Sequence, residues 1–247
     1  MNLTGNTILI TGGGSGIGQA LAHEFHQRGN TVIIAGRRQS ALDATVSAHP
    51  GMHSIVMDTG DAASIAAGVA KLTADFPALN AVIQNAGIMK PEDLKSGDTT
   101  TAEATIATNL LGPIRLTAAL MPHLLKQPSA TILTVSSGLA FVPMASNPTY
   151  CATKAAIHSY TQSLRYQLQG TNVCVVEIIP PWVATELQGA IPTDPRAMPL
   201  DAYIAETMQL LASDADEILV NNVLPLRNAE KGDQPAFFKA LNDSLPH

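Results

Sequence analysis

Short apolar runs alternate with longer stretches of helical period along most of the chain. The runs are rich in Val and Ile, and they span residues 7–11, 31–35, 54–57, 81–84, 130–135, 171–179 and 217–220. The helical stretches between them span residues 17–28, 40–48, 62–73, 101–126, 150–169 and 201–212. This alternation predicts an α/β fold, a three-layer doubly wound parallel sheet of about seven strands with helices on both faces.

No linker, repeat or low-complexity tract interrupts the pattern, so we expect residues 1–247 to form a single domain. A chain of 247 residues, 46% of them hydrophobic, can bury one substantial core. Residues 189–199 contain three prolines and are predicted to be a loop over one edge of the sheet.

Composition limits the classes of binding partner and the cellular compartment that we expect for this protein. Charged residues make up 14% of the chain and the net charge is −6, which argues against nucleic acid as a partner. No apolar run reaches the ~18 residues of a membrane span, and the N-terminus lacks the pattern of a signal peptide. The two cysteines have no metal-ligand spacing and suit a reducing compartment. We therefore expect a cytoplasmic protein with no metal site.

A glycine-rich turn follows the first predicted strand and precedes the first predicted helix. Residues 8–18 read Ile-Leu-Ile-Thr-Gly-Gly-Gly-Ser-Gly-Ile-Gly. Glycines let the backbone approach a phosphate, and the start of a helix supplies unpaired N–H groups and a positive dipole end. A turn of this kind between a strand and a helix predicts binding of a dinucleotide pyrophosphate.

The spacing of this turn, T-G-x-x-x-G-x-G, resembles the short-chain dehydrogenase/reductase family rather than the commoner G-x-G-x-x-G pattern. The resemblance implies a Rossmann-type fold and assigns Gly12, Gly16 and Gly18 to the cofactor turn, with Ile17 beside the pyrophosphate. Ser15 stands in the same turn, where many NADP-using relatives carry a basic residue.

The end of the second predicted strand bears on the choice between NADP and NAD. An acidic residue there would accept the ribose hydroxyls of NAD and repel a 2′-phosphate, but the chain has Gly36, followed by Arg37 and Arg38. Guanidinium groups bind phosphate bidentately and keep their charge. NADP is therefore the predicted cofactor. The alternative is an NAD-dependent member whose arginines are solvated charges at a helix entry.

Two more strand ends resemble cofactor motifs of the family. Asp58-Thr59 resembles a pair whose carboxylate accepts a hydrogen bond from the adenine amino group. Asp58 could equally cap the following helix, a role that Asp61 could also fill. Asn85-Ala86-Gly87 matches a motif that supports the sheet and the cofactor ribose, with Gln84 in place of the family's first Asn.

Tyr150 and Lys154 lie four residues apart in a predicted helix, so both side chains emerge from one face. A phenol with a pKa of ~10 is a poor proton donor or acceptor at neutral pH. A neighbouring cation lowers that pKa, and the pair therefore suits general acid–base chemistry. The resemblance gives both residues this role and assigns Lys154 to the nicotinamide ribose as well.

The resemblance supplies two further catalytic groups. Asn109 lies in the predicted helix 101–126, which Gly112-Pro113 should disturb, and would hold a water on a proton path to Lys154. Ser137 follows the strand 130–135 at the carboxyl edge of the sheet, thirteen residues before the tyrosine, as in the family. Its hydroxyl would hydrogen-bond the substrate oxygen.

Residues 179–185 resemble the family's Pro-Gly-x-Val-x-Thr motif. In that motif Pro180 precedes Val183, whose backbone would bind the nicotinamide carboxamide, and Thr185 offers a hydroxyl. Pro181 replaces the glycine, which removes one N–H group and fixes φ near about −65°. Carboxamide binding with altered geometry is the expectation.

The resemblance fades beyond residue 186. The expected substrate loop, residues 186–200, is mainly small and apolar, and the expected pocket includes Leu139, Phe141, Met144 and Trp182, which favours an uncharged substrate. The divergent tail, residues 221–247, resembles a DltE-like bacterial branch of the family and contains a predicted terminal helix at 237–241.

We therefore predict an NADP(H)-dependent oxidoreductase that transfers hydride between nicotinamide and a small carbonyl or alcohol, with Tyr150 as general acid or base. Because family members usually assemble through their two long helices, a homo-oligomer, dimer or tetramer, is expected. The alternative from another class is a nucleotide-responsive binding protein without turnover, and the alternative among enzymes is an epimerase or dehydratase that uses bound NAD.

Overall fold

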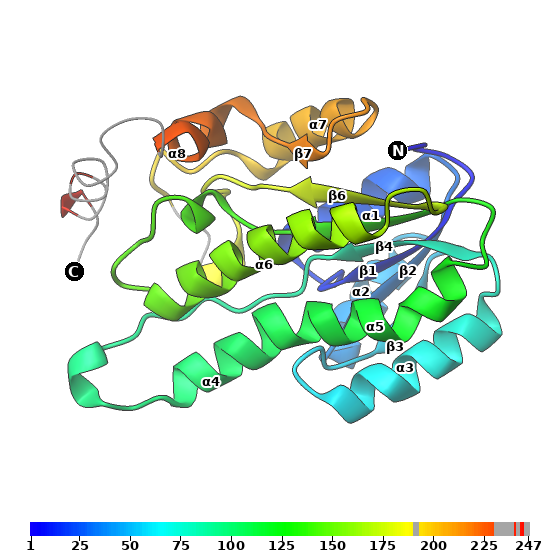
Figure 1. The fold of residues 1–247 in the computed structure, drawn as a ribbon, viewed down its shortest axis with the longest axis horizontal. Coiled ribbons are helices and arrows are strands. Elements are labelled where there is room, and N and C mark those ends of the chain that lie inside the picture. Colours follow the sequence, from blue (N-terminus) through cyan, green and yellow to red (C-terminus); the bar gives the residue numbers. More distant parts are fainter. Residues whose placement is uncertain (190–192, 230–239, 241–242, 245–247) are drawn as a thin grey trace.

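A seven-stranded parallel sheet forms the centre of the computed structural model, which describes residues 1–189, 193–229, 240 and 243–244 (Figure 1). Its strands are β1 (Thr7–Thr11), β2 (Thr31–Gly36), β3 (His53–Val56), β4 (Leu79–Gln84), β5 (Ala130–Val135), β6 (Val173–Ile178) and β7 (Glu217–Ile218). They lie side by side in the order β3-β2-β1-β4-β5-β6-β7, and every pairing is parallel. The predicted doubly wound sheet is confirmed.

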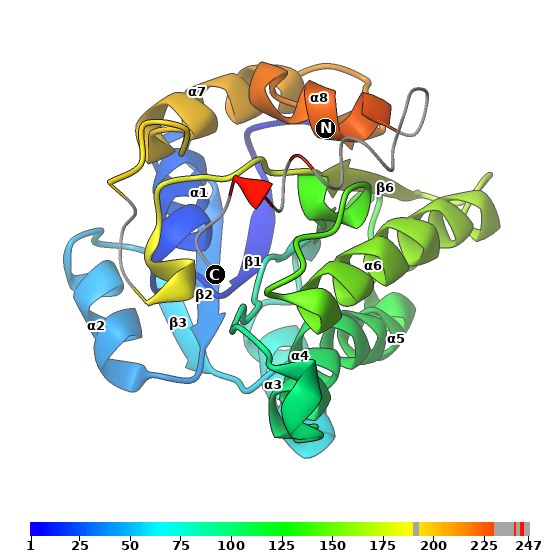
Figure 2. The same cartoon turned by 90° about the vertical axis from the view of Figure 1, so that its left-hand side faces the viewer.

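Helices cover both faces of the sheet (Figure 2). Their bounds are α1 (Gly16–Gln27), α2 (Gln39–Ser47), α3 (Ala62–Asp75), α4 (Thr100–Ile106), α5 (Gly112–Leu124), α6 (Pro148–Gln167), α7 (Leu200–Leu211) and α8 (Leu224–Asn228). One buried apolar cluster lies between the sheet and α1, α2 and α7, and a second lies between the sheet and α3, α5 and α6. The strands are therefore buried on both faces, as their continuous apolar runs require.

The strand order reverses between β1 and β4, which lie next to each other although two strand–helix units separate them in the chain. In open parallel sheets, ligands bind at such a switch point, beyond the carboxyl ends of the strands. The glycine turn follows β1 and the Asn85-Ala86-Gly87 segment follows β4. The fold thus brings two cofactor motifs together that lie far apart in the sequence.

The helix predicted over 101–126 is not continuous. It divides into α4 and α5, and a π-helical turn, Ala107–Leu111, joins them. The N–H group of Gly112 bonds to the carbonyl of Ala107, five residues back, and Pro113 has no N–H group to restore the α-helical pattern. The predicted disturbance at Gly112-Pro113 is therefore real, and it widens the helix around Asn109.

The ends of the chain add three smaller findings. β7 is shorter than the run predicted at 217–220, and the terminal helix predicted at 237–241 lies outside the described residues, apart from residue 240. Cys151 is buried, as expected, whereas Cys174 is exposed on β6. None of the described helices combines the length and the apolar character needed to cross a bilayer.

Candidate active site

The glycine turn after β1 has no room for side chains at two of its three motif positions. Gly12 has a φ of 68°, and a Cβ there would lie 2.8 Å from the amide nitrogen of Asn85. A Cβ on Gly18 would collide with the same nitrogen and with the carbonyl of Gly12. Gly16 has a φ of 54°, a left-handed conformation that glycine adopts most readily. These contacts explain the glycine spacing physically.

Asn85 fixes the turn from the neighbouring strand. Its side-chain Nδ2 donates to the carbonyl of Thr11 at 3.0 Å, and the N–H of Ala86 donates to the Thr11 hydroxyl at 3.1 Å. Gln84 points elsewhere, because its Nε2 donates to Thr117 on α5 at 2.8 Å. The motif therefore supports the sheet and the turn as expected, and Gln84 ties β4 to α5.

Arg37 and Arg38 are both exposed where β2 ends. The turn reaches this strand directly, since the N–H of Gly13 donates to the carbonyl of Ala35 at 3.2 Å. No ion pair within the described part of the chain involves either guanidinium. Two uncompensated cations beside a phosphate-binding turn are suited to a further phosphate group.

The Asp58-Thr59 segment, just after β3, contacts other parts of the protein that it helps to hold in place. Asp58 accepts from the N–H of Gly60 at 2.9 Å, while Asp61, not Asp58, caps α3 by accepting from Ala63 at 2.9 Å. Thr59 is buried, and its carbonyl lies 2.5 Å from the place that a Cβ on Gly112 would occupy. The open choice of helix cap is thereby resolved in favour of Asp61.

Asn109 connects the π-helical turn to the segment after β4. Its Nδ2 donates to the carbonyl of Ile88 at 2.8 Å, and its Oδ1 accepts from the N–H of Ile88 at 2.9 Å. The same Nδ2 lies 3.5 Å from the hydroxyl of Thr153 on α6. Both ends of the side chain are therefore occupied by protein, and a water role for Asn109 stays a prediction.

Ser137, Tyr150 and Lys154 meet beyond the carboxyl end of β5, and all three are buried. The hydroxyl of Ser137 lies beside the phenol of Tyr150, where it favours the phenolate as a hydrogen-bonding group. The Nζ of Lys154 lies 5.5 Å from the centroid of the Tyr150 ring and donates to the carbonyl of Val135 at 2.8 Å. The expected one-face arrangement of tyrosine and lysine is thus present, with the serine beside the phenol.

The pKa of Tyr150 differs from the expectation. Burial raises the pKa of this phenol above its ordinary value, and the Ser137 hydrogen bond only partly opposes that effect. Burial also lowers the pKa of Lys154 to about 8, against the opposing charge of Glu177. In the protein alone, Lys154 therefore does not depress the tyrosine pKa as predicted, because desolvation dominates and the ammonium bonds the Val135 carbonyl instead.

A carboxylate that the sequence did not reveal holds the start of α6. Glu92 accepts from the N–H of Thr149 at 3.1 Å and from the Thr149 hydroxyl at 2.8 Å. Asn147, at the usual capping position, makes no side-chain cap. A negative charge at a helix N-terminus is favourable, so Glu92 fixes the turn that carries Tyr150.

The segment after β6 approaches the glycine turn. Val183 forms a β-bridge with Met198, in which the N–H of Met198 donates to the carbonyl of Trp182 and the N–H of Ala184 donates to the carbonyl of Met198. The N–H and carbonyl of Val183 itself therefore point to the opposite side. Thr185 lies 3.5 Å from the place of a Cβ on Gly16. The carbonyl of Pro180 accepts from Gly138 at 2.9 Å. Val183 and Thr185 therefore lie near the glycine turn, and their binding of the carboxamide stays a prediction.

An apolar cluster surrounds the phenol and consists of Met89, Met144, Tyr150 and Cys151, with Leu139 packed against it. Met89 was not foreseen, although it follows the Asn-Ala-Gly motif by two residues. Phe141 was expected here, and that expectation is wrong. Phe141 belongs to the apolar cluster on the α1, α2 and α7 side of the sheet, where its ring centroid lies 4.9 Å from that of His158 and 4.8 Å from the guanidinium of Arg227.

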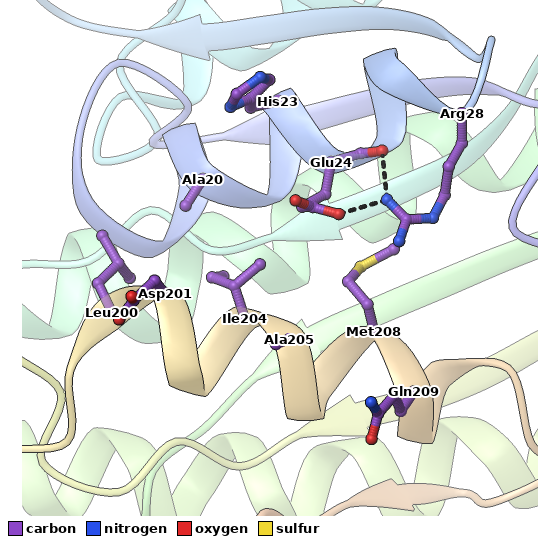
Figure 3. Close-up of a pocket in the computed structure, with 10 residues that line it drawn as sticks. All are labelled: Ala20, His23, Glu24, Arg28, Leu200, Asp201, Ile204, Ala205, Met208 and Gln209. Atoms are coloured by element: carbon purple, nitrogen blue, oxygen red, sulfur yellow. Dashed lines mark hydrogen bonds and ion pairs between the residues drawn. The ribbon is translucent and has the colours of Figure 1, made fainter.

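A groove of about 750 Å³ lies elsewhere, between α1 and α7 (Figure 3). Arg28, just past the far end of α1 from the glycine turn, forms an ion pair there with Glu24. Met208 and Ile204 of α7 supply apolar lining. None of the predicted site residues lines this groove, so its volume does not mark the chemistry.

The residues at the switch point fit a nicotinamide dinucleotide. The crowding at Gly18 keeps a bare backbone at the start of α1, where a pyrophosphate would bind, and among the described residues no backbone bond engages the N–H or carbonyl of Val183. Tyr150 and Ser137 stand near the expected nicotinamide end, and Arg37 and Arg38 near the adenosine end.

Comparison with known proteins agrees with this geometry. Residues 6–196 match the family model described as short chain dehydrogenase. The chain is 39% identical to an oxidoreductase named DltE from Bacillus subtilis, over 98% of each chain.

Two solved structures share the fold. One is a short chain dehydrogenase from Burkholderia cenocepacia in complex with NADP, with a TM-score of 0.85, 22% identity and complete coverage of both chains. The other, from Burkholderia phymatum in complex with NAD, has a TM-score of 0.83, 21% identity and 96% coverage of each chain. The protein therefore belongs to the short-chain dehydrogenase/reductase family, as an NAD(P)-dependent oxidoreductase of its DltE-like branch.

Proposed function

We propose that the protein is an NADP(H)-dependent reductase or dehydrogenase that interconverts a small, uncharged carbonyl compound and its alcohol. The observation that carries the proposal is the buried Tyr150, with the Ser137 hydroxyl beside its phenol and the Lys154 ammonium 5.5 Å from the centroid of its ring. When bound, the nicotinamide would supply or accept the hydride. A non-catalytic binding protein would not need this group of side chains.

Each side chain has a definite task in this proposal. Ser137 donates to the substrate oxygen and holds it next to the phenol, which fixes the reacting geometry. Tyr150 gives its proton to that oxygen during reduction and takes it back during oxidation. The raised pKa of Tyr150 keeps the phenol protonated before the reaction, and the Lys154 charge would stabilise the phenolate that forms when the proton leaves. Lys154 places a positive charge beside the oxygen and is available to the cofactor ribose.

The apolar walls support an uncharged substrate. Met89, Met144 and Leu139 surround Tyr150, and Gln188 at the start of the predicted substrate loop lies 3.6 Å from the sulfur of Met89. Desolvation in such surroundings opposes a charged group on the substrate. Cytoplasmic location and assembly into a homo-oligomer stay part of the proposal, and the latter is tested below.

The test of turnover is an absorbance assay at the reduced-nicotinamide band, with a panel of ketones, aldehydes and secondary alcohols and with each cofactor in turn. We expect consumption of NADPH with at least one uncharged carbonyl compound. Failure with the entire panel, together with normal NADPH binding, would favour the nucleotide-responsive binding protein instead.

NADP preference rests on Arg37 and Arg38, since the solved relatives include complexes with either cofactor. NADPH should bind at least about tenfold tighter than NADH, a difference of ~1.4 kcal/mol. The double change Arg37→Gln and Arg38→Gln should remove most of that ratio, as measured by cofactor fluorescence titration. Arg28→Gln, which changes an arginine at the far end of α1, is the matched control, and equal NADPH and NADH affinities in the unmodified protein would contradict the assignment.

A further inference from the structure

β6 buries a carboxylate that the proposed chemistry does not use. Glu177 is completely inaccessible to solvent and lies between β5 and β7. Both of its oxygens lie close to Nδ1 of His158, at 3.0 and 2.9 Å. Burying a carboxylate is costly unless cations and donors surround it, so the surroundings of Glu177 indicate why it is there.

The catalytic lysine lies on the same stretch of α6. His158 follows Lys154 by four residues, so the two side chains share one face of the helix. Lys154 donates to the carbonyl of Val135, and Thr134, the residue before Val135, is in register with Glu177 on the adjoining strand. Glu177 therefore lies below the part of α6 that carries both Lys154 and His158.

A second charge pair stands beside the first. Glu217 on β7 is in register with Glu177, and Arg227 of α8 donates to its two oxygens at 3.0 and 3.3 Å. The ligand atoms of His158, Glu177 and Glu217 lie within 4.8 Å of one another, as in some metal sites. Here, however, each carboxylate already has a protein donor, and one of these is a permanent cation. The cluster is therefore a row of charge pairs.

We propose that Glu177 is the counter-charge of Lys154, a positioning residue that keeps the lysine protonated in its buried site while His158 holds the carboxylate in place. The proposal rests on the proposed function only in taking Lys154 as the active-site cation. Because Lys154 otherwise meets a neutral carbonyl and an aromatic ring, a nearby negative charge is what a buried ammonium requires.

The electrostatics of the site agree with the geometry. Glu177 is the charged group that opposes the effect of burial on the pKa of Lys154 and raises it. The other titratable or charged groups near this face of α6 are Tyr150, Cys151, His158, Glu217 and Arg227. The Glu177 carboxylate, in turn, raises the pKa of His158 through their hydrogen bond. The Glu177 carboxylate thus favours the protonated forms of both Lys154 and His158, which lie on consecutive turns of α6.

The test follows the protonation of Lys154 directly. Protein labelled with ¹³C at lysine Cε is titrated by NMR without cofactor or substrate, and the Lys154 signal is identified by its absence in Lys154→Met. Glu177→Gln removes the charge and keeps an acceptor for His158. We expect the Lys154 signal to titrate about one pH unit lower in this variant. An unchanged titration in a folded Glu177→Gln protein would overturn the proposal.

His158→Gln is the matched control, because it disturbs the same contact and keeps the carboxylate. Its Lys154 titration should stay within about 0.3 pH unit of the unmodified protein or move upward, since no negative charge is lost. A downward shift as large as that of Glu177→Gln would attribute the effect to packing and overturn the proposal. If Glu177→Gln does not fold, the direction of the Lys154 shift in His158→Gln decides between the counter-charge and a packing effect, because only a packing effect would move the titration downward.

The titration also separates this proposal from the proposed function. An inactive protein with the expected Lys154 shifts would refute the reductase assignment and leave the counter-charge in place. Conversely, an active protein whose Lys154 signal ignores Glu177 would refute the counter-charge only. With an active substrate, the alkaline limb of the turnover profile should also move to lower pH in Glu177→Gln, whereas a purely structural defect would lower turnover evenly across pH.

Discussion

A single methyl group at Gly18 is incompatible with the cofactor turn as it stands. The Cβ would collide with the side chain of Asn85 and with the backbone of Gly12, and neither can move without breaking the bonds that hold the turn to β4. At the scale of one residue, steric exclusion therefore explains why the turn reads as it does. The same argument makes the glycine pattern the most reliable signal in the sequence.

Gly18→Ala should lower the affinity for NADPH by at least about tenfold, a loss of ~1.4 kcal/mol. The reason is that the turn must open to admit the methyl group, which moves the N–H groups at the start of α1. Gly14→Ala in the same turn is the control, since its Cβ would meet the methyl group of Ala41 at 3.3 Å and the backbone of Ala41 at 3.5 and 3.6 Å, without the collisions found at Gly18. Fluorescence titration of both variants decides, and equal losses would contradict the steric account.

Sequence analysis missed polar residues whose hydrogen-bond partners lie far away along the chain. Glu92 caps a helix 57 positions away, and Glu177 contacts a histidine 19 positions away. No periodicity or local motif encodes such pairs, because they arise only when the elements pack. Phe141 illustrates the converse, since a residue four positions after Ser137 can turn to either side of the sheet edge.

At the scale of elements, α6 depends on its first turn. The helix begins at Pro148, two positions before Tyr150, and Glu92 supplies acceptors to Thr149 there. The Tyr150 phenol is therefore attached to the part of a helix that frays most easily. A carboxylate from the loop after β4 prevents that fraying and couples the two segments.

Glu92→Ala should lower the free energy of unfolding by about 1 kcal/mol and reduce turnover more than this loss of stability implies. Urea unfolding and turnover would be measured on the same preparations. Glu103→Ala removes a comparable contact, from the hydroxyl of Thr99 at 2.8 Å, at the exposed start of α4, and should leave turnover unchanged. Unaltered turnover in Glu92→Ala would show that the cap does not position Tyr150.

The π-helical turn shows what the local rule about proline in helices can predict and what it cannot. Proline chemistry predicted a disturbance at Gly112-Pro113, and the structure confirms it. The rule did not say that the helix would widen rather than bend or end, because that choice depends on the pairing of Asn109 with Ile88 and on the contact of Gly112 with Thr59.

At the scale of the whole molecule, the seven strands and six helical stretches predicted from hydrophobic period occur in the predicted order, since strands buried on both faces and amphipathic helices have distinct patterns. The structure adds the division of the stretch 101–126 into α4 and α5, and the short helix α8. Their bounds shifted by one or two residues in most cases, as ladder bonds and caps decide where an element ends. The spatial strand order required the family resemblance or the structure.

Some of the exposed apolar side chains lie on the two long helical stretches expected to mediate assembly, 101–126 and 150–169. Ile106, Leu111 and Tyr166 are 39%, 36% and 73% exposed on α4, the π-helical turn and α6. We expect a homo-oligomer by light scattering and a shift toward monomer in Leu111→Glu/Tyr166→Glu, because buried charge opposes association. Val56→Glu, at the exposed end of β3, should have no such effect, and a monomeric unmodified protein would contradict the prediction.

The central claim is that the Tyr150 hydroxyl transfers the proton, while other residues supply most of the binding of the cofactor. Turnover of the best carbonyl substrate by Tyr150→Phe, compared with NADPH affinity in the same protein, tests it most directly. Tyr166→Phe, at an exposed tyrosine on the same helix, is the control. The account predicts a loss of turnover of at least about 10²-fold with NADPH affinity nearly unchanged. Turnover close to that of the unmodified protein would contradict it.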